Sequence, residues 1–426
     1  MGRILVIGGG GREHALVRGV LRSPQHPEVL CAPGNAGIAR DRVPCLPVAA
    51  DDIDGIVRVA RDEGCDLVVV GPEAPLVAGA IDALGEAGIA AFGPTAAAAR
   101  IEGSKSFAKE LMRSVGVPTA GHVVLRDRAE AHAELAQAAY PVVLKADVLA
   151  AGKGVVICAD EAEARAAVEE FFVDRRFGKT EVLLEEFLEG DELSLLALCD
   201  GERAVPMAPA QDYKRIYDDD RGPNTGGMGS YSPVPGIEPG HAEVLVRAAH
   251  QPIVDELRRR GTPYHGVLYA GLMMTADGPR VLEYNCRFGD PETQAVLPRL
   301  RSDLVDLLRR ATRPGGLAGV ALEWSSAWAV TVVLSSRGYP ATSSSGDEIS
   351  GLEALDSLDV EVLHAGTAES EGRIVTAGGR VLNVTGIGDT AGVARDRAYA
   401  AADAIEFDGK QLRTDIAARA AERVEA

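Results

Sequence analysis

The 426-residue sequence has little of what several large protein classes require. Its six cysteines are scattered without a CxxC or Cys/His spacing, which argues against a disulfide framework or a zinc site. No apolar run approaches the ~18 residues of a membrane span, and the N-terminus has no small-residue cleavage site of a signal peptide. We therefore expect a cytoplasmic protein with no membrane partner.

Positive charge is also scarce, because 63 acidic residues against 44 basic ones give a net charge of −19. No Lys/Arg cluster stands out, so we expect no nucleic-acid partner. Lysine is rarer still, and six of the seven lysines lie between positions 105 and 214. Since the chain uses arginine for general surface charge, a lysine marks a place where a compact ammonium group is useful. The segment 105–214 is therefore the first place to look for an anionic ligand.

Apolar residues are plentiful, at 46%, and they occur in short runs that alternate with helical patterns. The length predicts roughly two to four domains of about 100–200 residues. Among the first 100 residues, alternating strand and helix patterns predict an open parallel sheet covered by helices. The expected strands are 3–9, 28–33, 66–73 and 89–95, and the expected helices are 14–23, 52–64 and 75–88. Near the other end, residues 372–386 predict a hairpin with its turn at 377–379.

The glycine-rich stretch IGGGGREH (7–14) follows the first strand and opens a helix. It is a poor dinucleotide fingerprint, because no small third residue is correctly placed and no acid ends the second strand. Its backbone N–H groups at a helix N-terminus suit a single phosphate instead. The loops at 33–37 and 71–73 should face the same crevice, at the carboxyl ends of the parallel strands. The alternative is that these glycines only make tight turns.

A second glycine-rich stretch, LAAGKG (149–154), follows Lys145. It is not a Walker A loop, because glycine follows Lys153 and a strand rather than a helix comes next. We expect a flap whose backbone N–H groups approach phosphate oxygens. Lys145 ends an apolar strand and should have an anionic partner, since an unpaired buried lysine would cost several kcal/mol. The alternative is a lysine that reaches solvent.

The stretch VLEYNCRFGDPETQ (281–294) begins as an apolar strand and ends in a run of charges. Residues two apart on a strand share a face. The expected faces are Val281, Glu283, Asn285 and Arg287 on one side and Leu282, Tyr284 and Cys286, as core, on the other. The oxygens of Glu283 and Asn285 suit Mg²⁺, whose other positions are filled by water and phosphate oxygens. Arg287 would then meet phosphate or carboxylate charge; the alternative is a structural Glu–Arg ion pair.

Four stretches in chain order, KADVLAAGKGVV, EEFLEGDELS, QDYKRIYDDDRGPNTGGMGSYSP and EYNCRFGDPETQ, together resemble the phosphoribosylamine–glycine ligase family. The likeness begins at GGGGREH and PGNAG and covers essentially the whole chain. It implies an α/β architecture, with an ATP-grasp fold preceded by an open parallel-sheet, Rossmann-like domain and followed by a small α+β domain. The expected divisions are 1–102 for the N-terminal domain, 103–120 with 191–324 for the main ATP-grasp part, 121–190 for its lid and 325–426 for the C-terminal domain.

The resemblance implies an ATP-dependent ligase that joins glycine to 5-phosphoribosylamine through glycyl phosphate, in purine biosynthesis. It implies Mg²⁺ or Mn²⁺ as the cofactor metal, and we expect a monomer. The implied metal ligands are Glu283 and Asn285. The implied nucleotide contacts are Lys105, Lys145, Ala151, Gly152, Lys153, Gly154, Glu185, Glu186, Phe187, Leu188 and Glu192. The implied substrate contacts are Gly9, Gly10, Gly11, Arg12, Asn35, Glu73, Asn224, Thr225 and Gly226. Arg287 is expected to stabilise the transferring phosphoryl group, and Asp212, Lys214, Asp290 and Glu292 to orient glycine and the amine.

Three other interpretations stay open at this point. An NAD-dependent oxidoreductase would need an acid after the second strand and would leave Lys145, Glu283 and Asn285 without a use. A different ATP-grasp ligase, such as a biotin carboxylase relative, would not be expected to carry the RFGDPE run. A non-catalytic nucleotide sensor is disfavoured by the intact set of charged positions.

Overall fold

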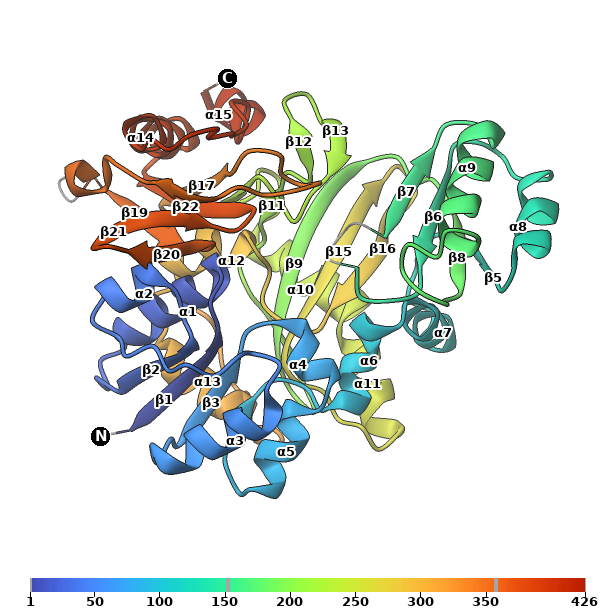
Figure 1. Cartoon of the computed structure of the whole chain (residues 1–426). Coiled ribbons are helices and arrows are strands. Elements are labelled where there is room, and N and C mark those ends of the chain that lie inside the picture. Colours follow the sequence, from blue (N-terminus) through green and yellow to red (C-terminus); the bar gives the residue numbers. More distant parts are fainter. Residues whose placement is uncertain (1, 151–153, 356–358, 426) are drawn as a thin grey trace.

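The computed structural model describes residues 2–150, 154–355 and 359–425. The N-terminal and C-terminal parts of the chain lie against each other, and a separate β-rich unit extends from the opposite end of a central sheet (Figure 1). Among the described residues, every helix is too short or too polar to cross a bilayer. The chain is thus an α/β assembly whose parts meet around the central sheet.

The N-terminal part is the expected parallel sheet, with strands in the order β2-β1-β3-β4. Both faces of the first strand are buried, with Leu5 and Ile7 on one side and Ile4 and Val6 on the other. Such two-sided burial is typical of a parallel sheet between helices. The elements are β1 (Arg3–Gly8), α1 (Gly11–Leu21), β2 (Glu28–Pro33), α2 (Ala36–Arg40), α3 (Ile53–Asp62), β3 (Leu67–Val70), α4 (Glu73–Val77), α5 (Ala80–Glu86), β4 (Ala91–Phe92) and α6 (Ala96–Gly103).

The single helix expected at 75–88 is wrong, because the chain forms α4 and α5 there instead. Gly79 separates them with a φ of 95°. This left-handed conformation is open to glycine at little cost and is incompatible with a continuous right-handed helix. The break allows α4 to begin at Glu73, at the edge of the sheet where the functional loops lie.

The β-rich unit, which the sequence analysis expected to be a lid, is an antiparallel sheet in the order β5-β8-β6-β7 with helices on one face. Leu144 and Leu184 point into the core beneath these helices. Because side chains alternate along a strand, Lys145 and Glu185 lie on the opposite face, toward the central sheet. The elements are β5 (His122–Leu125), α8 (Arg128–Leu135), β6 (Val142–Ala146), β7 (Val155–Cys158), α9 (Glu161–Phe172) and β8 (Val182–Glu186).

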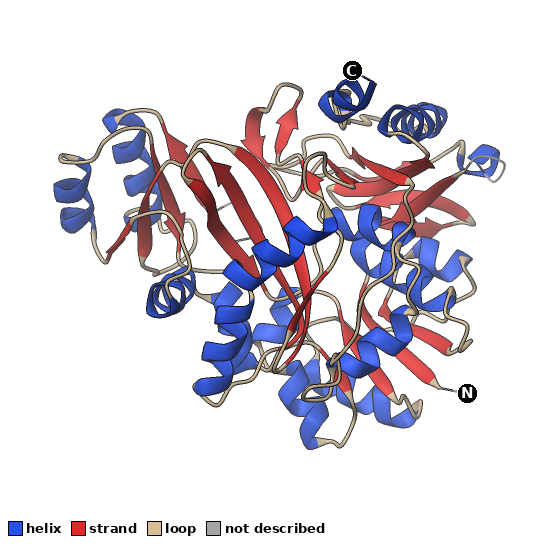
Figure 2. Cartoon of the chain, turned by 180° about the vertical axis from the view of Figure 1, so that it is seen from behind, coloured by secondary structure: helices blue, strands red, loops and turns tan. Residues whose placement is uncertain are grey.

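The central sheet is antiparallel, in the order β10-β9-β15-β16. Figure 2 shows helices across its rear face. The apolar residues Ala242 and Leu245 of α10 and Ile253 of α11 pack there against Leu195 and Ala197 of β9. The elements are α7 (Lys105–Val115), β9 (Asp191–Asp200), β10 (Ala204–Pro206), α10 (Pro239–Ala249), α11 (Gln251–Arg259), β15 (His265–Thr275), β16 (Gly278–Asn285), α12 (Glu292–Val296), the 3₁₀ turn η1 (Leu297–Arg299) and α13 (Leu304–Ala311).

Strand β16 departs from simple alternation at one point. Its pairing with β15 skips a residue, because Gly271 pairs with Glu283 and Leu272 pairs with Val281. The extra residue, Leu282, is a β-bulge, which changes the faces of the residues on either side of it. The expectation for Val281 and Leu282 is therefore wrong: Val281 is 1% exposed in the core, whereas Leu282 lines the large cavity.

The C-terminal part contains a sheet in the order β11-β14-β17-β22-β19 and a smaller one in the order β18-β21-β20. Strands β11 and β14 come from the segment around residue 220, so this sheet joins the C-terminal part directly to the centre. The elements are β11 (Gln211–Asp212), β12 (Arg215–Tyr217), β13 (Arg221–Asn224), β14 (Gly229–Ser232), β17 (Trp328–Ser335), β18 (Ser345–Glu348), the 3₁₀ turn η2 (Leu352–Leu355), β19 (Val360–His364), β20 (Thr367–Ser370), β21 (Arg373–Ala377), β22 (Arg380–Gly388), α14 (Ala391–Ala404) and α15 (Ala418–Glu425).

The hairpin expected at 372–386 is wrong. Strand β21 pairs with β18 and β20, whereas β22 pairs with β17 and β19. The chain crosses from one sheet to the other at Gly378, where a Cβ added to Gly366 would lie 2.7 Å from the Gly378 Cα. Gly366 and Gly378 permit two backbone segments to cross closely. The same glycine-rich sequence would also fit a tight hairpin turn, so the sequence alone does not distinguish the two.

Candidate active site

A cavity of about 910 Å³ lies where the lid, the central sheet and the two terminal parts meet. Each part contributes to its wall: Arg12 from the N-terminal part, Lys145 from the lid, Glu283 from the central sheet and Arg380 from the C-terminal part. The wall therefore brings together residues that are far apart in the sequence.

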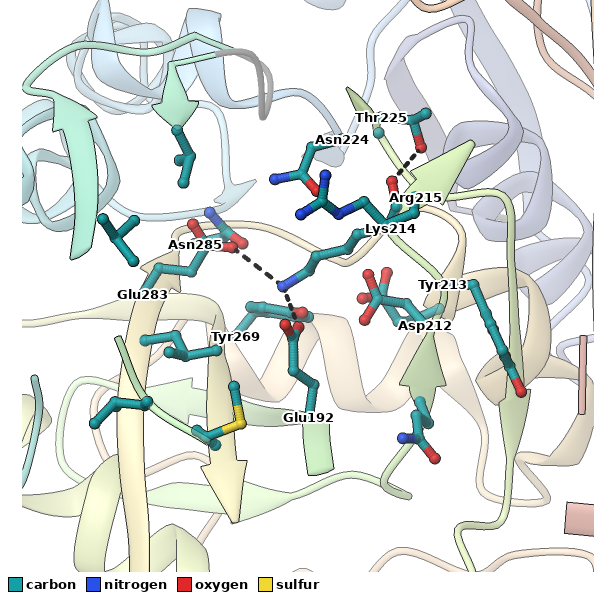
Figure 3. A pocket seen from close by; sticks show the side chains of 18 of the residues that line it. Glu192, Asp212, Tyr213, Lys214, Arg215, Asn224, Thr225, Tyr269, Glu283 and Asn285 are labelled. Carbon is teal, nitrogen blue, oxygen red and sulfur yellow. Dashed lines mark hydrogen bonds and ion pairs between the residues drawn. The ribbon is translucent and has the colours of Figure 1, made fainter. Parts of the chain in front are cut away.

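Glu283 and Asn285 lie side by side at the end of β16 and face the side chain of Lys214 (Figure 3). The Nδ2 of Asn285 donates to Glu102 Oε1 at 3.0 Å, which leaves its Oδ1 toward the cavity. Burial opposes the charge of Glu283, but the ammonium groups around it, Lys214 foremost, lower its pKa overall. The pair therefore offers one ionised carboxylate and one amide oxygen.

These two groups fit Mg²⁺ or Mn²⁺ when phosphate oxygens complete the coordination. Among the residues that the structure describes, no group of three or more His, Cys, Asp or Glu side chains is arranged to hold a metal ion. A site with two protein oxygens is suited to a cation that arrives with a phosphate chain. It is less suited to a permanently bound structural metal.

Lys145 has the anionic partner that its position predicts. Its Nζ lies 3.0 Å from Glu185 Oε2, and Lys109 reaches the same oxygen at 3.1 Å. The other oxygen, Glu185 Oε1, is buried without a hydrogen-bond partner among the described residues. Lys109 was missed by the sequence analysis, although lysine scarcity and its place one helical turn after Lys105 could have signalled it. The Nζ of Lys105 donates to the carbonyls of Ala146 and Val148, both at 2.9 Å.

The same part of the cavity has an apolar lining, of which the sequence analysis identified Leu188 but not Ala120, Met273 or Leu282. Ala120, Leu188 and Met273 form a small cluster, against which Leu282 packs. All four line the cavity, together with Glu185, Glu186 and Phe187. An apolar slot beside buried polar groups suits a flat heterocyclic base.

Another part of the cavity wall, next to this slot, is rich in carboxylates. Asp212 lies near Glu292, Glu192 and Glu283, with Lys214 as the principal cation. Burial and these like charges raise the pKa of Asp212 to about 8, although Lys214 opposes the rise. The Nζ of Lys214 lies 2.6 Å from Glu192 Oε2 and 3.9 Å from Glu283 Oε1. A cationic group entering here would be favoured, because it relieves the repulsion between carboxylates.

Arg287 is held between two carboxylates, Glu73 and Glu102, each at 3.3 Å. Burial opposes its charge, and these carboxylates raise its pKa overall. Burial also raises the pKa of Glu102, which the guanidinium of Arg287 opposes. Glu102 was missed because it lies about 180 positions before the strand that it contacts, in no motif.

Asp290 and Glu292 take different places in the wall. Asp290 is paired with Arg380 at 3.0 Å, while Arg380 also donates to the carbonyls of Gly226 and Asp290. Glu292 is 3% exposed and accepts a hydrogen bond from Ser194 at 3.0 Å. Arg380, like Lys109 and Glu102, was missed by the sequence analysis, and it brings the C-terminal part into the cavity.

The expected substrate residues of the N-terminal part divide into two groups. Arg12 and Glu73 line the cavity, whereas Gly9, Gly10, Gly11 and Asn35 are not among its described lining residues. The amide of Asn35 is used within the protein, since its Nδ2 donates to the carbonyls of Gly9 and His364 and its Oδ1 caps α2. Its position fixes the glycine loop against the C-terminal part.

The other expected residues are placed as follows. Asn224, Thr225 and Gly226 line the cavity, and the hydroxyl of Thr225 donates to the carbonyl of Lys214 at 2.9 Å. Gly154 lines the cavity beside β6. The flap residues Ala151, Gly152 and Lys153 lie outside the described residues.

Comparison with known proteins gives one consistent result. The phosphoribosylglycinamide synthetase family matches in three parts: its N domain at residues 2–102, its ATP-grasp domain at 103–293 and its C domain at 329–419. A phosphoribosylamine–glycine ligase of Streptomyces coelicolor is 52% identical over 98% of this chain and 99% of its own length. A trifunctional purine biosynthetic protein of Gallus gallus is 46% identical over 98% of this chain and 42% of its own length.

Solved structures agree. The crystal structure of a phosphoribosylamine–glycine ligase from Thermotoga maritima superposes with a TM-score of 0.83 and 35% identity, covering 97% of this chain and all of the other. A biotin carboxylase domain from Hydrogenobacter thermophilus superposes with a TM-score of 0.72 at 18% identity, covering 96% of this chain and 91% of the other. The second likeness shows a shared fold alone, and it confirms the expected ATP-grasp architecture.

Proposed function

The chain belongs to the phosphoribosylglycinamide synthetase family, and we propose that the cavity described above is where its reaction takes place. Relatives named phosphoribosylamine–glycine ligase match it over nearly its whole length, so it is a carbon–nitrogen ligase of purine biosynthesis. The reaction joins glycine to 5-phosphoribosylamine at the expense of ATP and gives glycinamide ribonucleotide, ADP and phosphate.

The chemistry requires an activated carboxylate. The carboxylate of glycine is a poor acyl donor, because its charge repels nucleophiles and oxide does not leave. Transfer of the γ-phosphoryl group of ATP to a carboxylate oxygen gives glycyl phosphate and ADP. The amine of phosphoribosylamine then attacks the acyl carbon, the bond from that carbon to the phosphate oxygen breaks, and the amine loses a proton. Such a sequence needs positioning and charge stabilisation rather than covalent chemistry by the protein.

The nucleotide would occupy the lid side of the cavity. The apolar slot of Leu188, Met273 and Leu282 suits adenine, with the backbone at 185–188 alongside. Lys105 and Lys145 would meet the phosphates, and the free carboxylate oxygen of Glu192 would accept from the ribose hydroxyls. The segment 150–154, of which 151–153 lie outside the described residues, is proposed to contact the nucleotide as well.

Glu283 and Asn285 would hold Mg²⁺ or Mn²⁺ through their oxygens. When bound, such a cation neutralises phosphate charge and fixes the geometry of the phosphate chain. Lys214 and Lys105 keep Glu283 ionised, which is the state that a metal ligand requires. Arg287 would stabilise the phosphoryl group in transfer, since its guanidinium is held in place by two carboxylates.

Glycine and the amine would bind at the carboxylate-rich part of the wall. Asp212 and Glu292 would take the ammonium group of glycine, because a cation there relieves the repulsion that contributes to the raised pKa of Asp212. Lys214 and Asp290 border the same space. The sugar phosphate would lie between Arg12 and Glu73 on one wall and 224–226 on the other.

Glycyl phosphate must be protected from water. We propose that the unit 121–190 closes as a lid over the rest of the ATP-grasp part, 103–120 with 191–324. Its sheet meets the central part where Lys145 donates to the carbonyl of Leu282 at 3.2 Å and where Arg280 donates to Glu186 at 2.8 Å. The divisions at 102 and 324 would separate this part from the N-terminal and C-terminal domains.

We also propose a cytoplasmic monomer. The cysteines are free thiols, as suits a reducing compartment. Sedimentation velocity at working concentration checks the oligomeric state. A species of twice the monomer mass would refute this part of the proposal.

The observation that carries the proposal is the pairing of Glu283 and Asn285 in the wall of a cavity that is also lined by Lys214, Asp212 and Glu192 (Figure 3). The test is ADP release with ATP, Mg²⁺, glycine and phosphoribosylamine, repeated with each component omitted. We expect release to require glycine. ADP release that ignores glycine would contradict the proposed reaction at this site.

A further inference from the structure

A single buried carboxylate lies behind the strand end that carries the proposed metal ligands. Glu102 is in the last turn of α6, and its side chain is 7% exposed. Its Oε1 accepts from Asn285 Nδ2 at 3.0 Å and lies 3.3 Å from Arg287 Nη2. Its Oε2 accepts from the backbone N–H of Cys286 at 2.6 Å. One carboxylate therefore holds three successive residues.

The chemistry of the two partners determines which atom of Asn285 faces the cavity. A carboxylate with three donors around it acts only as an acceptor, whereas an amide has one donating and one accepting end. Since Glu102 takes the donating end of Asn285, the carbonyl oxygen is turned away from it, toward the cavity. A divalent cation needs that oxygen and is repelled by an NH₂ group.

We propose that Glu102 is a positioning residue that presents the Asn285 oxygen to the metal and keeps Arg287 beside it. The inference rests on the proposed function, because it takes Asn285 as a metal ligand. Groups that orient metal ligands in this way are worth about 10–100-fold in metal affinity. A purely structural Glu102, which only pairs with Arg287, would affect stability without affecting metal binding.

The test is Glu102→Gln, measured by Mn²⁺ binding in the presence of a non-hydrolysable ATP analogue, with the Mn²⁺ electron paramagnetic resonance signal as readout. Glutamine offers one oxygen and one NH₂ group in place of two oxygens. If its oxygen keeps the Cys286 N–H, its NH₂ faces Asn285, whose amide must turn and present nitrogen to the cavity. We expect Mn²⁺ affinity to fall about tenfold or more, with affinity for the metal-free analogue unchanged.

A double variant sharpens the test. In Glu102→Gln combined with Asn285→Asp, the glutamine NH₂ donates to one aspartate oxygen and the other oxygen faces the cavity. We expect Mn²⁺ affinity to return to within about threefold of the parent, since the correct atom is presented again. Asn285→Asp alone places the new carboxylate against that of Glu102, so we expect its Mn²⁺ affinity to stay below that of the double variant. A double variant that binds Mn²⁺ no better than Glu102→Gln would overturn the inference, as would a Glu102→Gln variant with the parent affinity.

Controls separate this inference from the proposed function. If Glu283→Ala and Asn285→Ala both keep the parent Mn²⁺ affinity, the proposed metal site itself is wrong. If both lose it while Glu102→Gln does not, only the role of Glu102 is wrong. Glu110→Gln, on the neighbouring helix and paired with Arg260 at 3.4 Å, should behave as the parent.

Thermal melting identifies any variant that fails to fold. Should Glu102→Gln do so, Glu102→Asp replaces it, because aspartate still only accepts hydrogen bonds and cannot turn the Asn285 amide. A folded Glu102→Asp is expected to keep Mn²⁺ affinity within about threefold of the parent. A larger loss in that variant would contradict the orientation argument.

Discussion

The ammonium group of Lys109 lies 3.1 Å from Glu185 Oε2, in an ion pair whose two side chains are each 2% exposed. Lys145 reaches the same oxygen at 3.0 Å, so one carboxylate serves two cations. Burial lowers the pKa of Lys109, and the charge of Glu185 opposes this effect. The cluster carries a net positive charge at the end of the cavity assigned to the nucleotide.

Removing Lys109 should therefore weaken nucleotide binding without removing a group that touches the phosphates. In Lys109→Met, Glu185 is left with Lys145 alone and neutralises it. We expect the KM for ATP to rise about tenfold, which corresponds to ~1.4 kcal/mol, with the KM for glycine unchanged. Steady-state kinetics with each substrate varied checks this. Lys410→Met is the matched control, because the Lys410 ammonium bonds the carbonyls of Ala402 and Ile405 and the carboxylate of Glu406, none of which is among the described residues that line the cavity. An unchanged KM for ATP in Lys109→Met would contradict the prediction.

Arg413 fixes the hairpin of β12 and β13 from the C-terminal part. Its side chain is fully buried and donates to Asp220 at 2.9 Å and to the carbonyl of Arg215 at 3.1 Å, while its guanidinium lies over the Tyr213 ring. In Arg413→Met we expect the free energy of unfolding to fall by about 2–4 kcal/mol, because the fully buried guanidinium and its charge-assisted hydrogen bonds are lost. Hydrogen–deuterium exchange should rise at 215–224. The KM for glycine should rise as well, because this hairpin follows Lys214.

The control for Arg413 is a surface ion pair of the same domain. Arg337 pairs with Asp408 at 2.6 Å, with both side chains about two-thirds exposed. Arg337→Met should change stability by less than about 1 kcal/mol. Equal exchange at 215–224 in the parent and Arg413→Met would show that the hairpin is held by other contacts.

The raised pKa of Asp212 predicts a pH-dependent stability. Burial, with neighbouring carboxylates, raises this pKa from 3.8 to about 8. Between about pH 4 and about pH 8 the folded chain keeps a proton that the unfolded chain has lost, so this group destabilises the fold increasingly as pH rises. In Asp212→Asn the effect is absent. We expect the Tm of the variant minus that of the parent to increase from pH 5 to pH 8. The corresponding difference in free energy of unfolding should increase by at most about 4 kcal/mol.

Two measurements make that prediction decisive. Asp51→Asn, at an exposed loop position, should show no trend with pH. Turnover of Asp212→Asn should fall, because asparagine cannot become the carboxylate that would hold the ammonium group of glycine. A Tm difference that is flat or decreases between pH 5 and pH 8 would exclude a raised pKa at Asp212.

Much of this arrangement could be predicted from local sequence, and the reasons are physical. Period-two alternation places Glu283 and Asn285 together, and an apolar strand ending in Lys145 predicts a buried partner. Glu102 and Arg380 could not be found in this way, because their contacts join residues roughly 90 to 180 positions apart. The local sequence around Glu102 and Arg380 does not indicate which distant residues they contact.

The β-bulge at Leu282 had no sequence signal either, and it reverses an expectation that can be tested. Alternation alone places Val281 with Glu283 toward the cavity and Leu282 in the core. The bulge instead buries Val281 to 1% exposure and turns Leu282 into the slot assigned to adenine. A pair of adjacent alanine substitutions therefore distinguishes the two arrangements, because they should affect different properties.

Val281→Ala should lower the free energy of unfolding by about 2 kcal/mol, since it removes buried methyl groups and leaves a cavity. Its KM for ATP should stay at the parent value. Leu282→Ala should have the opposite profile, with a smaller loss of stability and a KM for ATP raised about three- to tenfold through lost contact with the base. Denaturant unfolding and ATP-dependent kinetics on both variants check this. If Val281→Ala instead raised the KM for ATP and Leu282→Ala mainly lowered stability, Val281 would lie in the slot and the β-bulge at Leu282 would be contradicted.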